Sequence, residues 1–166
     1  LELTNSEFSS GVSTSDSIRV SEGDLTSEFA TYNGQISTDD NEVDVSGTAA
    51  GQSTVLAVFV GARGNTATEQ ITVEDDDSFS EEDIDIGSLS EGTFTAHVYS
   101  AGRDGDIGAD DPAISTISDL ENDINNLGGS GQQVRDRIVA LTVDADGSDD
   151  LLTTEELRLT DSRTDI

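Results

Sequence analysis

Two stretches of this chain place several carboxylates within a few residues of glycine. The first is Asp104-Gly105-Asp106-Ile107-Gly108-Ala109-Asp110-Asp111, and the second is Asp144-Ala145-Asp146-Gly147-Ser148-Asp149-Asp150. Hard cations such as Ca²⁺ take six to eight oxygen ligands from carboxylates, carbonyls and water, and glycine lets the backbone turn its carbonyls inward. We therefore expect a Ca²⁺ site in these stretches, with the candidate ligands Asp104, Asp106, Asp110, Asp144, Asp146 and Glu155.

The second stretch partly matches the spacing of a helix-loop-helix calcium loop. Positions 1, 3, 5, 7 and 12 of such a loop would be Asp144, Asp146, Ser148, Asp150 and Glu155. Position 6 is normally glycine, but Asp149 stands there and the glycine falls at position 4. Acidic loops also arise as plain solvated surface in a chain this rich in aspartate. The spacing therefore leaves both interpretations open.

The side chains needed for nucleophilic catalysis are mostly missing. His97 is the one imidazole of the chain and falls within an expected strand, which favours a packed or rim residue over a general base. A catalytic triad needs a serine on an exposed turn beside such a base, and no Gly-x-Ser-x-Gly turn occurs. Lysine and cysteine are absent, which removes Schiff-base and thiolate chemistry. Composition leaves open a hydrolase with paired carboxylates, but aromatic sugar platforms are scarce, and we expect no enzyme.

The charge of the chain is strongly one-sided. Asp and Glu number 36 against 7 arginines, giving a formal net charge of -29 at pH 7. A folded protein of this mass has a mean spacing of about 16 Å between uncompensated charges, and the Debye length is about 10 Å at 0.1 M salt but about 3 Å at 1 M. We therefore expect a domain from a high-salt habitat, with intrinsic disorder as the alternative. Binding to the phosphate backbone of nucleic acid is excluded by the same charge.

Length and apolar content limit the architecture. The chain has 166 residues, so we expect a single domain over 1–166. No run approaches the ~18–20 apolar residues of a membrane span, and no signal-peptide pattern is present. Because the first residue is Leu1, we interpret the chain as a fragment or a processed piece.

Short runs of alternating or continuous apolar residues predict strands. They are Ser17–Val20, Leu25–Tyr32, Glu42–Gly47, Thr54–Val60, Ala67–Val73, Asp83–Ile86, Thr93–Tyr99 and Leu151–Leu159, the last expected as an edge or closing strand. Turn signals such as Asn33-Gly34 separate them every 8 to 12 residues, a spacing typical of a β-sandwich. The run Thr54–Val60 is apolar throughout and predicts a central strand.

The period changes to that of helices near residues 116–142. A start resembling a capping box at Ser118 precedes Leu120, Ile124 and Leu127, and Gly128-Gly129 ends this helix. A second helix from about Gln132 to Leu141 places Val134, Ile138 and Leu141 on one face. The sequence thus predicts a helical hairpin inserted between two strands.

Several of these runs resemble haloarchaeal surface-layer (cell surface) glycoproteins. The matching segments are Ser10–Ser13, Ser17–Val20, Tyr32–Gln35, Val45–Ala49, Asp76–Ile84, Ala96–Val98, Gly102–Asp104 and Ser148–Leu159, and the similarity covers essentially the whole chain. The resemblance implies an all-β, immunoglobulin-like sandwich with the helical insertion. It also implies a secreted protein of tandem domains that forms a lattice on the cell surface. Proteins of this family are glycosylated and associate with divalent cations.

Two functions follow as expectations. The first is a non-catalytic structural module of an extracellular lattice, whose partners are neighbouring subunits, tandem domains and divalent cations. The alternative is a calcium-dependent adhesion or glycan-binding module, which needs an exposed aromatic patch beside an acidic loop. N-linked glycans are not expected on this stretch, because no asparagine is followed two residues later by Ser or Thr.

Overall fold

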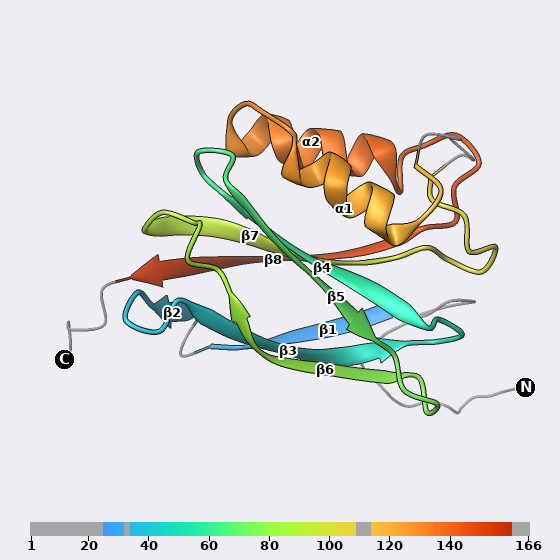
Figure 1. Ribbon diagram of the computed structural model, residues 1–166, viewed down its shortest axis with the longest axis horizontal. Coiled ribbons are helices and arrows are strands. Elements are labelled where there is room, and N and C mark those ends of the chain that lie inside the picture. The colour runs from blue at the N-terminus through green and yellow to red at the C-terminus, as the bar shows by residue number, and fades with distance from the viewer. Residues whose placement is uncertain (1–24, 32–33, 109–113, 161–166) are drawn as a thin grey trace, which may run out of the picture.

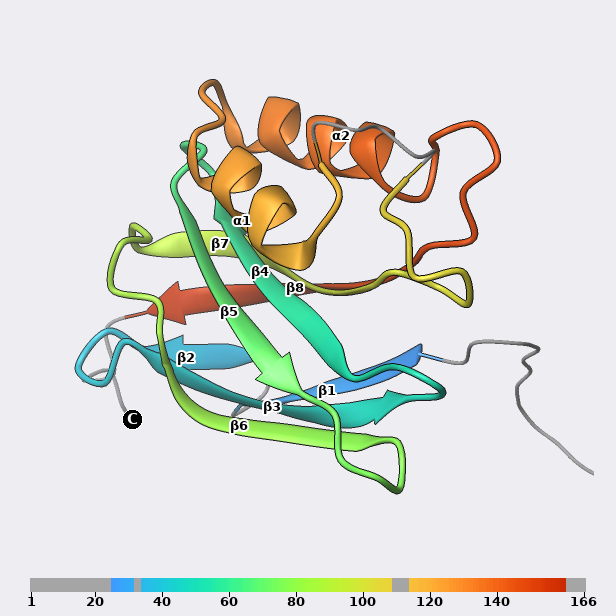
Figure 2. The ribbon, with the colours of Figure 1, turned by 45° about the vertical axis from the view of Figure 1, so that its right-hand side comes forward.

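The protein is built of three layers (Figure 1). The computed structural model describes residues 25–31, 34–108 and 114–160. One layer is a three-stranded sheet, ordered β1 (Leu25–Ala30), β3 (Glu42–Ala49), β6 (Ser78–Asp85). The next is a five-stranded sheet, ordered β2 (Gln35–Ser37), β8 (Leu151–Thr160), β7 (Gly92–Ser100), β4 (Thr54–Gly61), β5 (Thr66–Thr72). The helices α1 (Ile117–Asn125) and α2 (Gly131–Leu141) cover the outer face of the five-stranded sheet (Figure 2).

The strand order is that of an immunoglobulin-like sandwich. Immunoglobulin domains place their first, second and fifth strands in one sheet and their third, sixth and seventh in the other. Here β1, β3 and β6 form the first sheet, and β4, β7 and β8 lie side by side in the second, with β5 added beyond β4. All strand pairs are antiparallel except β2 with β8. The predicted fold class is therefore confirmed, and the helical hairpin lies in the connection between β7 and β8.

The space between the two sheets holds the larger core. Alternate residues of β3 point into it, with Val43 and Val45 buried while the residues between them are exposed. Phe59 lies at its centre and packs edge-on against Phe29, with ring centroids 5.9 Å apart, and obliquely against Phe94 at 6.3 Å. These contacts join β1 of one sheet to β4 and β7 of the other.

A second core lies beneath the helical hairpin. Leu120 and Ile124 of α1 and Val134 and Ile138 of α2 are buried there. Their spacing of four residues places each pair on one helix face. The sequence assigned these four residues to the buried faces, whereas Leu127 and Leu141 at the helix ends are only half-buried.

The hairpin explains why β4 is apolar throughout. Val55, Ala57 and Phe59 belong to the core between the sheets. The intervening Leu56, Val58 and Val60 belong to the core under the helices. A strand covered on both faces has no solvated side, so the alternation disappears. The central strand of the sheet is β7, and β4 lies between β7 and β5.

The observed element boundaries differ from the predicted ones at a few points. The N-cap of α1 is Thr116, two residues before Ser118. The Thr116 hydroxyl accepts the Asp119 N–H at 3.1 Å, and the Asp119 carboxylate accepts the Thr116 N–H at 3.0 Å. Strand β2 was not predicted, since three residues carry no periodic pattern. It pairs with β8, so β8 is not at the edge. The predicted strand Ser17–Val20 and Asn33 lie outside the described residues.

Backbone contacts hold the hairpin on the sheet. The Gly131 N–H, at the start of α2, donates to the Ala62 carbonyl in the β4–β5 turn at 3.1 Å. A Cβ at Gly131 would lie 2.3 Å from the Gly61 carbonyl oxygen, and one at Gly64 would lie 2.1 Å from that of Gly129. The two turns therefore meet backbone against backbone, which only glycine permits.

Side chains of β5 hold α1 along the same sheet. Gln70 donates to Ser118 at 3.1 Å and to the Glu121 carboxylate at 2.7 Å. Thr68 donates to Glu121 at 2.8 Å and accepts from Asn125 at 3.0 Å. This row of polar contacts fixes the position of α1 over the edge of the sheet.

Candidate functional site

The two acidic stretches meet around Tyr99 at one end of β7. Asp150, the residue before β8, is 6% exposed. Its Oδ2 accepts the Tyr99 hydroxyl at 3.0 Å and the Gly108 N–H at 2.7 Å. Its Oδ1 is buried and has no hydrogen-bond partner among the described residues. One carboxylate thus ties the loop after β7 to the loop before β8.

Burial dominates the protonation of this pair. It raises the pKa of Asp150 to about 6, while the donors Gly108, Tyr99 and Ser148 act in the opposite direction and the Asp104 carboxylate adds to the rise. Burial, followed by the charge of Asp150, raises the pKa of Tyr99 far above its ordinary value. A buried carboxylate without a cation beside it prefers the neutral form.

Asp149 makes a second connection between the same loops. Its Oδ2 accepts the Arg103 N–H at 2.9 Å, and its Oδ1 is buried without a hydrogen-bond partner in the described part of the chain. Gly102 has a φ of +71°, and a Cβ there would lie 2.1 Å from Asp149 Oδ1. The close approach of the two loops therefore depends on glycine at position 102.

The candidate metal ligands are only partly brought together. Asp104 lies close enough to Asp150 to raise its pKa, and the Asp106 N–H donates to Asp104 Oδ1 at 2.9 Å. Asp110 lies outside the described residues. Among residues 25–31, 34–108 and 114–160, no three acidic or imidazole side chains are arranged to hold a metal ion. Metal binding by Asp104, Asp106 and Asp110 stays a prediction.

The predicted ligands Asp144, Asp146 and Glu155 do not lie in a helix-loop-helix arrangement. Asp144 and Asp146 are in the turns that follow α2, and Asp150 is hydrogen-bonded to Tyr99. Glu155 lies within strand β8, opposite Ala96, on the strand face shared with the buried Leu157. The segment is thus helix, loop and strand, where a calcium loop has two helices. Asp144, Asp146 and Glu155 also stay predicted ligands.

His97 is a packed residue, as its position on a strand predicts. It is 2% exposed, and its Nδ1 is 3.1 Å from the Thr154 hydroxyl. Nε2 has no hydrogen-bond partner among the described residues. Burial lowers the pKa of His97 to about 4; a backbone hydrogen bond with Thr153 acts in the opposite direction, and the positive charge of Arg135 contributes to the lowering. The imidazole is therefore neutral at pH 7, buried, and in contact with the Thr154 hydroxyl.

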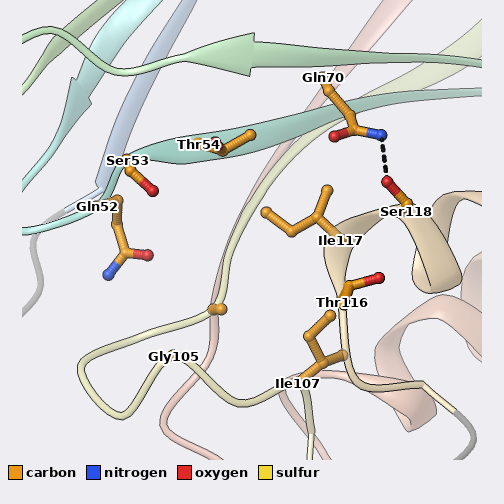
Figure 3. Close-up of a pocket in the computed structure, with 10 residues that line it drawn as sticks. Gln52, Ser53, Thr54, Gln70, Gly105, Ile107, Thr116, Ile117 and Ser118 are labelled. Atoms are coloured by element: carbon orange, nitrogen blue, oxygen red, sulfur yellow. Dashed lines mark hydrogen bonds between the residues drawn. The ribbon is translucent and has the colours of Figure 1, made fainter.

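A cavity of about 330 Å³ lies where the start of β4, the end of β5 and the N-terminus of α1 meet (Figure 3). Hydroxyl and amide side chains line it together with alanine and isoleucine side chains, and the hydrogen bond from Gln70 to Ser118 crosses its edge. The first turn of α1 is capped by Asp119 of the same helix. The lining contains no carboxylate, imidazole or aromatic ring, so this cavity lacks the groups of an acid–base or sugar-stacking site.

The aromatic patch required by an adhesion module is not formed by the described rings. Tyr99 is 1% exposed and held by Asp150. The phenylalanines Phe29, Phe59, Phe79 and Phe94 are all in the core. Tyr32 lies outside the described residues.

The fold and its surface define an acidic, immunoglobulin-like domain with a helical cap. No protein-family model matches the chain. The chain is 48% identical over 167 residues to the cell surface glycoprotein of Halobacterium salinarum (strain R1) and to that of Haloarcula japonica, and 52% identical over 168 residues to that of Haloarcula marismortui. Each match covers 99% of this chain but 19% of the relative, so the chain spans about one fifth of the length of these relatives.

The chain is therefore homologous to one segment of the haloarchaeal cell surface glycoproteins, as the sequence resemblance predicts, and its place is the cell surface. Neither helix of the described residues is long and apolar enough to cross a membrane. A crystal structure of a tetra-tandem repeat from a large adhesion protein overlaps with 49% of the chain and 21% of that protein, at 28% identity and a TM-score of 0.43. This overlap is too partial to carry a conclusion.

Proposed function

We propose that this chain is a structural, non-catalytic module of a surface-layer lattice that forms the cell wall of a halophilic archaeon. High salt and divalent cations assist its assembly. The observation that carries the proposal is a formal net charge of -29 on a folded domain homologous to cell surface glycoproteins. Such a charge opposes close packing of subunits in dilute salt and permits it when screened.

The fold suits a load transmitted along the chain. Strand β2 continues the course of β1 and runs parallel to β8, so β1 begins at the end of the sandwich opposite to where β8 ends (Figure 1). Neighbouring segments of a longer polypeptide would thus attach at opposite ends. Pulling along such an array shears the hydrogen-bonded ladders between strands, which resist together.

Divalent cations have carboxylates to bridge on this surface. The acidic loops on either side of the hairpin contribute Asp104, Asp106, Asp144 and Asp146, and β8 contributes the exposed Glu155. Because the described residues form no group of three ligands within one chain, we propose that ions join carboxylates of adjacent subunits. Each subunit would then supply part of the six to eight oxygens that Ca²⁺ requires.

The test uses the full-length protein, assembled as sheets and viewed by electron microscopy. Four conditions are compared: molar or dilute KCl, each with and without a chelator of divalent ions. We expect ordered sheets in molar KCl with Ca²⁺, looser sheets after chelation, and dispersed subunits when both salt and divalent ions are removed. Sheets that persist unchanged in dilute salt with chelator would refute the proposed assembly mechanism.

A further inference from the structure

The outer face of the three-stranded sheet is acidic and hollowed. Exposed carboxylates come from all three strands, namely Glu28, Glu42, Asp44, Glu82 and Asp85, and none of these strands carries an arginine. A depression of about 390 Å³ lies in this face. The short side chains Ala30, Ser46 and Ser80 line it together with the carboxylates of Glu28, Asp44 and Glu82. We name this depression the acidic groove.

The opposite layer carries the exposed positive charge. Helix α2, with Arg135 and Arg137 against Asp136, is the one helix or strand of the described residues in which arginines outnumber acids. Arg63 is exposed in the β4–β5 turn, beside the start of α2. None of these three arginines forms an ion pair within the described part of the chain. Together they form what we name the arginine surface.

Helix α1 carries three acids beside this surface, and two of them, Asp119 and Asp123, line a depression together with Arg137. The Asp119 carboxylate is engaged at the N-terminus of α1 by Ser115 and Thr116. Glu121 accepts hydrogen bonds from Thr68 and Gln70 at the sheet edge. The two helices carry four acids and two arginines, whereas the three strands carry seven acids and no arginine, so the helical layer is much less acidic than the three-stranded sheet.

The two surfaces lie on opposite sides of the molecule, because the five-stranded sheet separates them (Figure 2). A contact between the arginine surface of one copy and the acidic groove of another is therefore heterologous. Such contacts do not form an isologous two-fold dimer; they continue from copy to copy, into a ring where the rotation closes and into an open array where it does not. Continuation is what an extended array needs.

We propose that the arginine surface of α2 docks in the acidic groove of a second copy of this chain. The inference rests on the proposed function and adds the surfaces that meet. Arginine and carboxylate form short, bidentate hydrogen bonds whose strength depends on direct contact. Molar salt, with a Debye length of about 3 Å, screens the repulsion between whole domains more than it weakens such contacts. Docking of the two surfaces is therefore favoured in molar salt.

The test is reciprocal charge reversal, measured by sedimentation of the chain in molar KCl. Arg137→Glu places a carboxylate on the arginine surface, and Glu82→Arg places a cation in the acidic groove. We expect each variant to self-associate about tenfold more weakly than the unaltered chain, as loss of one charge-assisted bond implies. An equimolar mixture of the two variants should recover association, because each reversed surface then meets its complement.

Two variants with the same charge changes elsewhere are the controls. Arg158→Glu on β8 and Glu91→Arg before β7 both alter exposed residues outside the two surfaces. They should change self-association less than twofold. Arg137→Gln removes the positive charge of residue 137 without introducing a negative one. It replaces Arg137→Glu in the test if the circular dichroism spectrum of Arg137→Glu differs from that of the unaltered chain.

The outcomes separate this inference from the proposed function. Association that the reversals and the controls affect equally would overturn the assignment of surfaces and leave the lattice role standing. A chain that stays monomeric at every salt concentration would also overturn it. The lattice role itself stands or falls with the microscopy of the full-length protein.

Discussion

His97 in β7 and Asp150 in the loop before β8 are buried residues whose pKa values are shifted in opposite directions. His97 contacts Thr154 of β8 and feels the charge of Arg135 on α2. Asp150 contacts Tyr99 and Gly108 and feels the charge of Asp104. Both are driven toward their neutral forms by burial, but one becomes neutral by losing a proton and the other by gaining one.

The two groups therefore give opposite pH dependence to the free energy of unfolding. The pKa of Asp150 is about 6 in the folded chain against 3.8, so its stabilising contribution is complete below pH 3.8 and is lost as pH rises through 6. The pKa of His97 is about 4 against 6.5, so its contribution is complete above pH 6.5 and is lost as pH falls through 4. Between pH 4 and 6 the two slopes offset each other.

In the variant Asp150→Asn, only His97 of this pair contributes to the pH dependence of the free energy of unfolding. Asparagine still accepts hydrogen bonds from Tyr99 and Gly108, but it does not titrate. Between pH 6.5 and 4 the free energy of unfolding of this variant should fall by about 2 kcal/mol more than that of the unaltered chain. Urea unfolding at constant molar KCl across this pH range measures the difference. The exposed Glu91→Gln variant is the control. A variant that keeps the pH profile of the unaltered chain would show that Asp150 titrates normally.

At the scale of elements, the helical hairpin takes the place of solvent on one face of the sheet. It covers Leu56, Val58 and Val60 of β4 and Tyr99 of β7. Without this cover the sheet would present a continuous apolar surface, which soluble domains avoid. The insertion is therefore part of the folded core, and its seating on the β4–β5 turn decides its stability.

Gly131→Ala tests that seating. Alanine favours a helix over glycine by about 1 kcal/mol, but the added Cβ would lie 2.3 Å from the Gly61 carbonyl oxygen. We expect the contact to prevail, with a loss of about 1 to 3 kcal/mol in the free energy of unfolding. Gly128→Ala in the same turn is the matched control, since nothing lies within 4 Å of its Cβ. Equal urea midpoints for the two variants would mean that the turns do not meet as described.

At the scale of the whole molecule, net charge decides where the fold is stable. The accessible surface is 8365 Å², so each of the 29 net negative charges has an area of roughly 290 Å². At low ionic strength the electrostatic repulsion between neighbouring charges acts over the distance that this area implies. The described arginines Arg63, Arg135, Arg137 and Arg158 relieve little of this, since they form no ion pairs among the described residues. Solvent ions must supply the screening.

The thermal midpoint should therefore fall steeply as KCl is lowered from about 3 M to about 0.05 M, where the Debye length exceeds 10 Å. Circular dichroism melting follows it. MgCl₂ at equal ionic strength separates screening from specific binding of divalent ions, because screening alone gives the same midpoint for both salts. An unchanged cooperative melt in dilute, divalent-free buffer would contradict this dependence.

The sequence by itself determined the elements and the class of protein. Residue periodicity depends only on local geometry, so the alternation in β3 and the four-residue spacing of Leu120, Ile124, Val134 and Ile138 could be interpreted directly. The continuous apolar run of β4 indicated burial, but which layers bury it depended on the hairpin. The three residues of β2 are too few for a pattern, and only their pairing with β8 defines them.

Tertiary structure alone decided how the acidic residues are used. Asp104 and Asp150 are separated by the whole helical insertion, and only the fold brings their loops together at Tyr99. Spacing along the chain treated Asp150 and Glu155 as ligands of one loop, whereas the intervening residues form a strand that turns them to different surroundings. Local pattern reports which face of an element is apolar. Which distant loops share that burial depends on long-range packing, which no local pattern encodes.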